Sequence, residues 1–188
     1  MTRTGSTMLA LGTTAPEFSL PDVISGQIMT RDQVAGPSGL LVMFLCAHCP
    51  FVQHVNRELA RLGRDYAGRG IGIVAISSND AEAYPEDAPK GLRAQGAQHG
   101  FTFPYLYDET QEIARAYQAV CTPDYFLFDA EKKLVYRGQL DSSRPGNGIA
   151  VDGRDLRAAM DSVLAGTPVA EEQQASIGCS MQVEVKTP

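Results

Sequence analysis

Hydrophobic residues follow strand-like and helix-like spacings along most of the chain. Residues 39–45 and 70–77 are short apolar runs, typical of strands buried on both faces. Between them, residues 50–67 place apolar side chains at a helical spacing, at Phe51, Val55, Leu59 and Leu62. Strand, helix and strand in this order predict a right-handed βαβ unit with two parallel strands.

A polar crossover follows, and residues 90–99 within it predict a helix. The crossover is rich in acidic side chains, namely Asp80, Glu82, Glu86 and Asp87. They lack the spacing of a cation-binding loop, so we interpret them as a solvated segment.

The second half of the chain predicts a strand at residues 103–107 and a helix that Thr110 caps and that runs to Tyr117. Residues 125–128 and 134–137 form the two arms of a predicted β-hairpin, and residues 153–164 a final helix. The fold class is therefore α/β, a mixed central sheet with helices on both faces. We expect one domain over residues 9–166, a disordered segment over residues 1–8 and a tail over residues 167–188.

Composition narrows the class of protein. The chain has 188 residues, 44% of them hydrophobic and 20% charged, which predicts a globular protein whose core needs no disulfide or metal for stability. A net charge of −6 without a cluster of Lys or Arg argues against nucleic-acid binding. No apolar run suits a membrane span or a secretory signal, so we expect a cytoplasmic protein without a membrane partner, in a compartment that keeps thiols reduced.

The segment LCAHCPF, residues 45–51, carries the candidate chemistry. Cys46 is predicted at the end of a strand and the start of a helix, where the positive helix end should lower the thiol pKa from about 8.5. His48 lies between the cysteines and should act in the same direction. Cys49 can then attack a mixed disulfide on Cys46. These residues predict a redox pair with Cys46 as nucleophile and Cys49 as resolving cysteine.

Other interpretations of the cysteines stay open at this point. A CxxC motif is half of many zinc sites, but Cys121 and Cys179 stand alone in the sequence. Cys46, Cys49, His54 and Cys121 remain a conceivable ligand set, although His54 more simply lies on a polar helix face. Cys121 suits a small buried hydrophobic residue equally well. We expect no cofactor and no metal.

Several motifs resemble those of the peroxiredoxin and thioredoxin-like superfamily, of the AhpC/TSA type. The similar segments are residues 12–22, residues 41–50 with the CxxC motif, and Cys121-Thr122-Pro123 before a strand, in the order usual for the family. Stretches at 77–87, 103–110, 144–147 and 176–179 resemble an uncharacterised CxxC-containing, peroxiredoxin-like subgroup. The resemblance covers about residues 9–165. It implies a thioredoxin-like fold with an N-terminal extension and an inserted helical crossover.

Two chemistries occur in this superfamily. The peroxide-reducing cysteine of a peroxiredoxin precedes a proline, and Cys49 stands at that position here, before Pro50. The resemblance places Cys46 where such an enzyme has Thr or Ser, and Pro123 where it has an Arg that polarises peroxide. We therefore predict a thiol-disulfide oxidoreductase. An antioxidant thiol peroxidase using Cys49 is the second hypothesis, and a metal- or partner-binding module without turnover is the third.

The resemblance also assigns the surroundings of the redox pair. It implies a cis peptide bond between Thr122 and Pro123, in a loop that lies against the CxxC motif and offers backbone groups to an extended substrate segment. Cys121 would then lie near the pair. For Cys179 three alternatives stay open: a resolving cysteine, a cysteine that pairs with another chain, or an inert thiol. Arg144 is a weaker candidate for the substrate groove. The expected partners are a disulfide-containing protein or small molecule and a thiol electron donor, for a monomer or homodimer.

Overall fold

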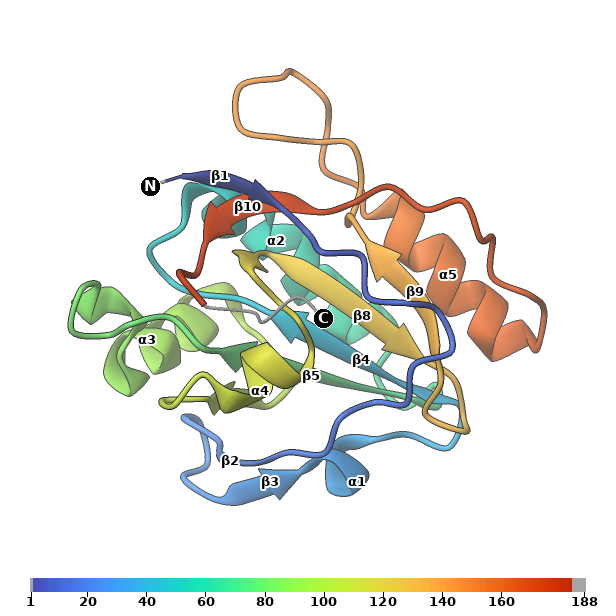
Figure 1. Cartoon of the computed structure of the whole chain (residues 1–188), viewed down its shortest axis with the longest axis horizontal. Coiled ribbons are helices and arrows are strands. Elements are labelled where there is room, and N and C mark those ends of the chain that lie inside the picture. Colours follow the sequence, from blue (N-terminus) through green and yellow to red (C-terminus); the bar gives the residue numbers. More distant parts are fainter. Residues whose placement is uncertain (1, 184–188) are drawn as a thin grey trace.

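A five-stranded mixed sheet forms the centre of the protein in this computed structural model, which describes residues 2–183 (Figure 1). Its strand order is β6 (Tyr105–Tyr107), β5 (Ile71–Ser77), β4 (Gly39–Phe44), β8 (Asp124–Phe128) and β9 (Leu134–Gly138). Strand β5 is parallel to β4 and β6, whereas β8 is antiparallel to β4 and β9. The predicted βαβ unit, hairpin and fold class are confirmed.

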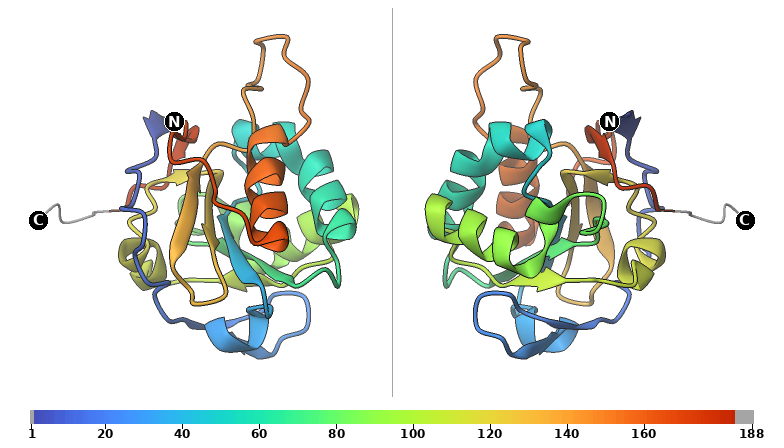
Figure 2. Two further views of the ribbon diagram at one scale, coloured as in Figure 1. Left: turned by 90° about the vertical axis from the view of Figure 1, so that its right-hand side faces the viewer. Right: turned by 90° about the vertical axis from the view of Figure 1, so that its left-hand side faces the viewer.

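Helices cover both faces of this sheet, as predicted (Figure 2). On one face, Leu41, Met43 and Leu45 pack against α2 (Pro50–Asp65), α3 (Pro89–His99) and α5 (Arg154–Ala165). On the other face, the intervening residues Leu40, Val42 and Phe44 pack against α4 (Glu112–Ala116), Tyr117 and the N-terminal segment. Successive side chains of a strand point to opposite sides, so the elements packed on the two faces together bury every residue of β4.

The start of α4 differs from the prediction. Its N-cap residue is Gln111, and the N–H groups of Ile113 and Ala114 donate to Oδ2 of Asp108 at 3.1 and 3.0 Å. Thr110 was therefore the wrong cap, because a buried carboxylate from the preceding strand end satisfies these groups instead.

Short elements that the apolar pattern did not indicate complete the N-terminal half. They are β2 (Ser19–Pro21), β3 (Ile28–Thr30), α1 (Arg31–Val34) and the 3₁₀ turn η1 (Pro85–Asp87). In α1, Thr30 and Gln33 form a capping box, with reciprocal side-chain bonds to each other's backbone N–H groups.

A second sheet joins the two ends of the described chain. Strand β10 (Ile177–Ser180) lies between β1 (Arg3–Gly5) and β7 (Cys121–Thr122), antiparallel to both (Figure 1). The prediction of disorder over residues 1–8 is wrong for residues 3–5, and the predicted tail contains a strand packed on the domain. Strands of two to four residues held by backbone bonds leave no periodic apolar pattern in the sequence. Residues 1 and 184–188 of these predicted segments lie outside the described residues.

Within the described part of the chain, no helix is both long and apolar enough to cross a membrane.

Asp124, the first residue of β8, is a fully buried carboxyl group. Burial raises its pKa to about 7, against smaller lowering effects from the nearby hydroxyls of Ser6 and Ser176 and the N–H group of Tyr125. Its Oδ2 atom has no hydrogen-bond partner among the described residues. A protonated carboxyl therefore suits this site better than a carboxylate.

Asp124 should make stability fall as pH rises from about 4 to about 7. In this window the unfolded chain has released the Asp124 proton while the folded chain retains it, so raising the pH favours unfolding, and above about 7 the effect is constant. We expect Asp124→Asn, which cannot ionise, to lose this component when denaturant unfolding is followed at several pH values. Parallel stability curves for the two proteins would contradict the assignment.

Candidate active site

The two cysteines of the CxxC motif occupy different places relative to α2. The helix begins at Pro50, and Cys49 is its N-cap residue, while Cys46 directly follows Leu45 beyond the end of β4. The prediction placed Cys46 at the helix start. In the structure the positive end of the helix lies at Cys49 instead, because Pro50 occupies the first helical position.

Cys46 is a fully buried thiol. Its Sγ atom lies 3.2 Å from Oγ1 of Thr122. Burial, and next the charge of Asp87, raise the pKa of Cys46 to about 12, although Thr122 and the N–H groups of Cys49 and His48 act in the opposite direction. The expectation of a lowered Cys46 pKa is therefore wrong in this state of the protein.

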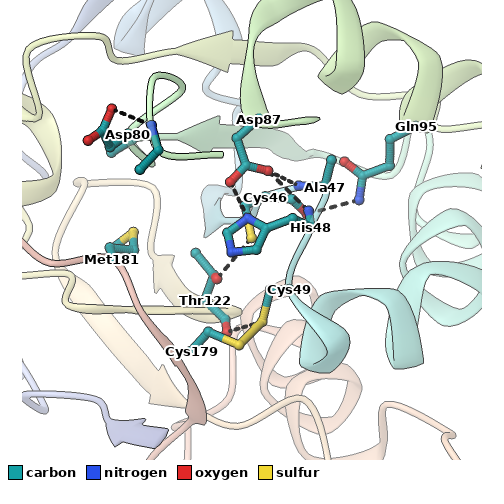
Figure 3. A network of polar contacts seen from close by, with 12 residues as sticks. Cys46, Ala47, His48, Cys49, Asp80, Asp87, Gln95, Thr122, Cys179 and Met181 are labelled. Atoms are coloured by element: carbon teal, nitrogen blue, oxygen red, sulfur yellow. Dashed lines mark hydrogen bonds and ion pairs between the residues drawn. A yellow bond between two sulfur atoms is a disulfide. The ribbon is translucent and has the colours of Figure 1, made fainter. Parts of the chain in front are cut away.

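Asp87 organises the loop between the two cysteines (Figure 3). Its Oδ1 atom accepts the backbone N–H groups of Ala47 at 2.7 Å and His48 at 3.1 Å, and its Oδ2 atom is bonded to Nδ1 of His48. The His48 ring also stacks on Tyr84, with ring centroids 3.9 Å apart. Asp87 is fully buried, so its interpretation as part of a solvated segment is wrong. In the sequence Asp87 is part of a Pro-Glu-Asp segment typical of a turn, which does not indicate this role.

Gln95 of α3 fixes the same loop from the interior. Its Nε2 atom donates to the carbonyl oxygen of Cys46 at 3.1 Å, and its Oε1 atom accepts the hydroxyl of Tyr105 at 3.0 Å. The backbone around Cys46 is thus held by buried side chains on both sides.

Cys49 forms a disulfide with Cys179 of β10 (Figure 3), with their Cα atoms 6.2 Å apart. The Cys49 sulfur also lies 3.4 Å from the carbonyl oxygen of Thr122. The structure thereby brings Cys179 to the predicted pair and leaves Cys46 as a thiol. The predicted Cys46–Cys49 disulfide is not the one present in this form.

The loop that precedes β8 has the predicted position and geometry. The peptide bond between Thr122 and Pro123 is cis, and Thr122 contacts both Cys46 and Cys49. Pro123 lines a small pocket together with Arg144. The guanidinium of Arg144 donates to the carbonyl oxygen of Asp141 and to Oε1 of Gln139, both at 2.6 Å, which orients it in its own loop.

The conceivable zinc set of the sequence is not assembled. Cys49 is oxidised, and Nε2 of His54 lies 2.7 Å from the Ser143 hydroxyl. Cys121 is a buried thiol whose pKa burial raises. Among the described residues, one other group, Cys46, His48 and Asp87, has sulfur, nitrogen and oxygen atoms all within 4.8 Å of one another. Such donors suit zinc, but the bond between His48 and Asp87 already uses two of them.

Comparison with known proteins identifies the family. The model of the AhpC/TSA family matches residues 11–137, about two thirds of the chain. The protein belongs to the AhpC/TSA family. This agrees with the resemblance carried by the sequence motifs.

Individual relatives of this AhpC/TSA protein indicate its class of reaction and its fold. A curated relative, the thiol:disulfide interchange protein DsbE of Allochromatium vinosum, is 31% identical over 131 residues, which are 68% of this chain and 67% of the relative. The structure of an uncharacterized conserved protein of Geobacillus kaustophilus is 51% identical, with a TM-score of 0.95 over 100% of this chain and 99% of that one. A putative thioredoxin of Neisseria meningitidis, 20% identical, shares the fold with a TM-score of 0.61 over 82% and 91% of the chains. The thioredoxin-like fold and the thiol-disulfide oxidoreductase class are confirmed.

Asp87→Asn should lower the pKa of Cys46 by about 1 unit, because it removes a negative charge beside the thiol and keeps the shape of the side chain. Thiolate absorbance against pH measures this directly, in a Cys121→Ser background that leaves Cys46 as the one free thiol while Cys49 and Cys179 are bonded. Asp80→Asn, in an exposed turn of the same crossover, is the matched control and should leave the titration unchanged. An unchanged pKa in Asp87→Asn would refute this role.

Proposed function

We propose that this protein reduces disulfides with the thiols of Cys46 and Cys49, which are restored by a thiol electron donor. One observation carries the proposal: Thr122 contacts a free thiol, Cys46, and a sulfur already engaged in a disulfide, Cys49. These are the two participants of a thiol-disulfide exchange. The predicted cytoplasmic location would suit a reductant and stays a prediction.

The order in which the two cysteines act is the finer part of the proposal. The sequence assigned the first attack to Cys46, and that order stays a prediction. The geometry supports the reverse order. Both cysteines are fully buried, but Cys49 lies at the positive end of α2, while Asp87 lies beside Cys46 and raises its pKa further. Cys49 also already bonds a cysteine from another segment of the chain.

In the proposed reaction, the Cys49 thiolate attacks one sulfur of a substrate disulfide, and the other substrate sulfur leaves as a thiolate. The Cys46 thiolate then attacks the Cys49 sulfur, which breaks the mixed disulfide, releases the second substrate thiol and forms the Cys46–Cys49 disulfide. Two electrons pass to the substrate. His48, held by Asp87, lies beside Cys46 and positions the loop for the second step.

In a Cys179→Ser background, which removes the other cysteine that bonds Cys49, Cys46→Ser and Cys49→Ser should each lower the turnover of a model disulfide by at least about two orders of magnitude, since neither serine can exchange disulfides. Only Cys46→Ser should accumulate a mixed disulfide with the substrate, on Cys49, and mass spectrometry can locate it.

The same experiment separates the two orders of attack. A mixed disulfide trapped on Cys46 in Cys49→Ser would restore the order predicted from the sequence. Cys121→Ser is the control for loss of a buried thiol and should keep the wild-type rate. Undiminished turnover in either active-site variant would refute the proposed function.

A peroxidase using Cys49 is the second candidate. Cys49 precedes Pro50 and forms a disulfide with the distant Cys179. A sulfenic acid on Cys49 would give the same disulfide by condensing with the Cys179 thiol. The Arg that would polarise peroxide is replaced by Pro123, so an antioxidant role stays a prediction.

We expect hydrogen peroxide to oxidise the prereduced protein more slowly than an equal concentration of a model disulfide does, because no such Arg stabilises the transition state on peroxide. Stopped-flow measurement of thiol loss, with dimedone trapping of sulfenic acid at Cys49, compares the two oxidants. A faster reaction with peroxide would make the peroxidase the better assignment.

A further inference from the structure

Strand β10 lies along the backbone edge beside the reactive sulfurs. Its pairing with β7 is antiparallel, with Cys179 opposite Thr122 and Ser180 opposite Cys121. Strand β7 has only two residues, and it pairs with β10 through its backbone N–H and carbonyl groups. An edge of this kind accepts an extended segment by strand addition.

The residue before Cys179 has to be a glycine for this approach. A β-carbon at position 178 would overlap the carbonyl oxygen of Thr122, the same group that lies 3.4 Å from the Cys49 sulfur. The obstruction would be backbone, which cannot move aside as the end of a flexible side chain can. Gly178 thus lets an extended segment come close enough for its cysteine to bond Cys49.

The segment around Cys179 therefore has the features of a bound substrate: an extended backbone paired with an edge strand, and a cysteine bonded to Cys49 (Figure 3). The thiol of Cys46, across Thr122, is the group that would release it. We propose that β10 is an internal occupant of the substrate position, and that the external substrates are extended polypeptide segments with a disulfide-bonded cysteine preceded by glycine. This inference rests on the proposed function and specifies its substrate class.

Release of β10 is a balanced exchange within the chain. Cys46 loses its proton and its thiolate attacks the sulfur of Cys49. The Cys46–Cys49 bond forms, the Cys49–Cys179 bond breaks, and Cys179 leaves as a thiolate that takes up one proton. No external oxidant or reductant takes part, and β10 is then held at the β7 edge by backbone pairing alone, which another segment can replace.

The test uses two peptides of sequence ASIGCSM and ASIACSM, each linked through its cysteine to thionitrobenzoate, whose release is followed by absorbance. With the prereduced full-length Cys179→Ser protein, kcat/KM should be at least about tenfold higher for the glycine peptide, because the alanine peptide meets the Thr122 carbonyl. Prereduced wild type should show the same preference, because β10 and its Gly178 are present in both proteins. Equal kcat/KM values would overturn the inference.

This failure is distinguishable from failure of the proposed function. If both peptides and a small model disulfide are reduced equally, the substrate class is wrong and the exchange chemistry stands. If none of the three compounds is reduced, or if their reduction does not need Cys49, the proposed function fails and the inference fails with it.

A second experiment tests the same contact inside the chain. After oxidation to one disulfide per molecule, Gly178→Ala should shift the population from Cys49–Cys179 towards Cys46–Cys49. Gly5→Ala is the matched control in the same sheet, because a β-carbon there lies 3.9 Å from the nearest atom, the carbonyl oxygen of Ser176. The same partition of disulfides in wild type and Gly178→Ala would overturn the inference.

Discussion

The approach of β10 to the backbone of Thr122 is the contact on which the arrangement of the sulfurs depends. A hydrogen atom in place of a side chain at Gly178 allows this approach, and the register then sets Cys179 opposite Thr122. Thr122 also contacts Cys46 through its hydroxyl and Cys49 through its carbonyl oxygen. A single threonine thus contacts or pairs with three cysteines, of which Cys49 and Cys179 are bonded to each other and Cys46 is a free thiol.

Electrostatics separate the two cysteines of the motif although they are three residues apart. Cys49 is the N-cap residue at the positive end of a sixteen-residue helix, a position at which negative charge is stabilised. Cys46 lies beside the buried carboxylate of Asp87, which opposes ionisation of the thiol while its hydrogen bonds hold the loop in place. The group that fixes the geometry therefore also restrains Cys46, in keeping with a second rather than a first attack.

Much of the fold could be predicted because it follows from continuous apolar runs and helical spacing, as in β4, β5 and α2. The cis bond at Pro123 followed from a family resemblance. The role of Asp87 and the pairing of Cys179 with Cys49 were not predicted, although Cys179 was a candidate resolving cysteine. Asp87 looked like its exposed acidic neighbours, and its burial comes from packing between the crossover and the CxxC loop. Cys179 is 130 residues from Cys49, and backbone pairing of short strands brings them together.

The central claim is that Cys49 is the sulfur shared by every disulfide that the protein forms within its chain. Disulfide mapping by mass spectrometry, on wild-type protein quenched with acid across a series of redox buffers, tests it most directly. The account predicts Cys49–Cys179 and Cys46–Cys49 as the two species, with populations that exchange as Cys46 ionises at higher pH. A dominant disulfide between Cys46 and Cys179, or one that contains Cys121, would contradict it.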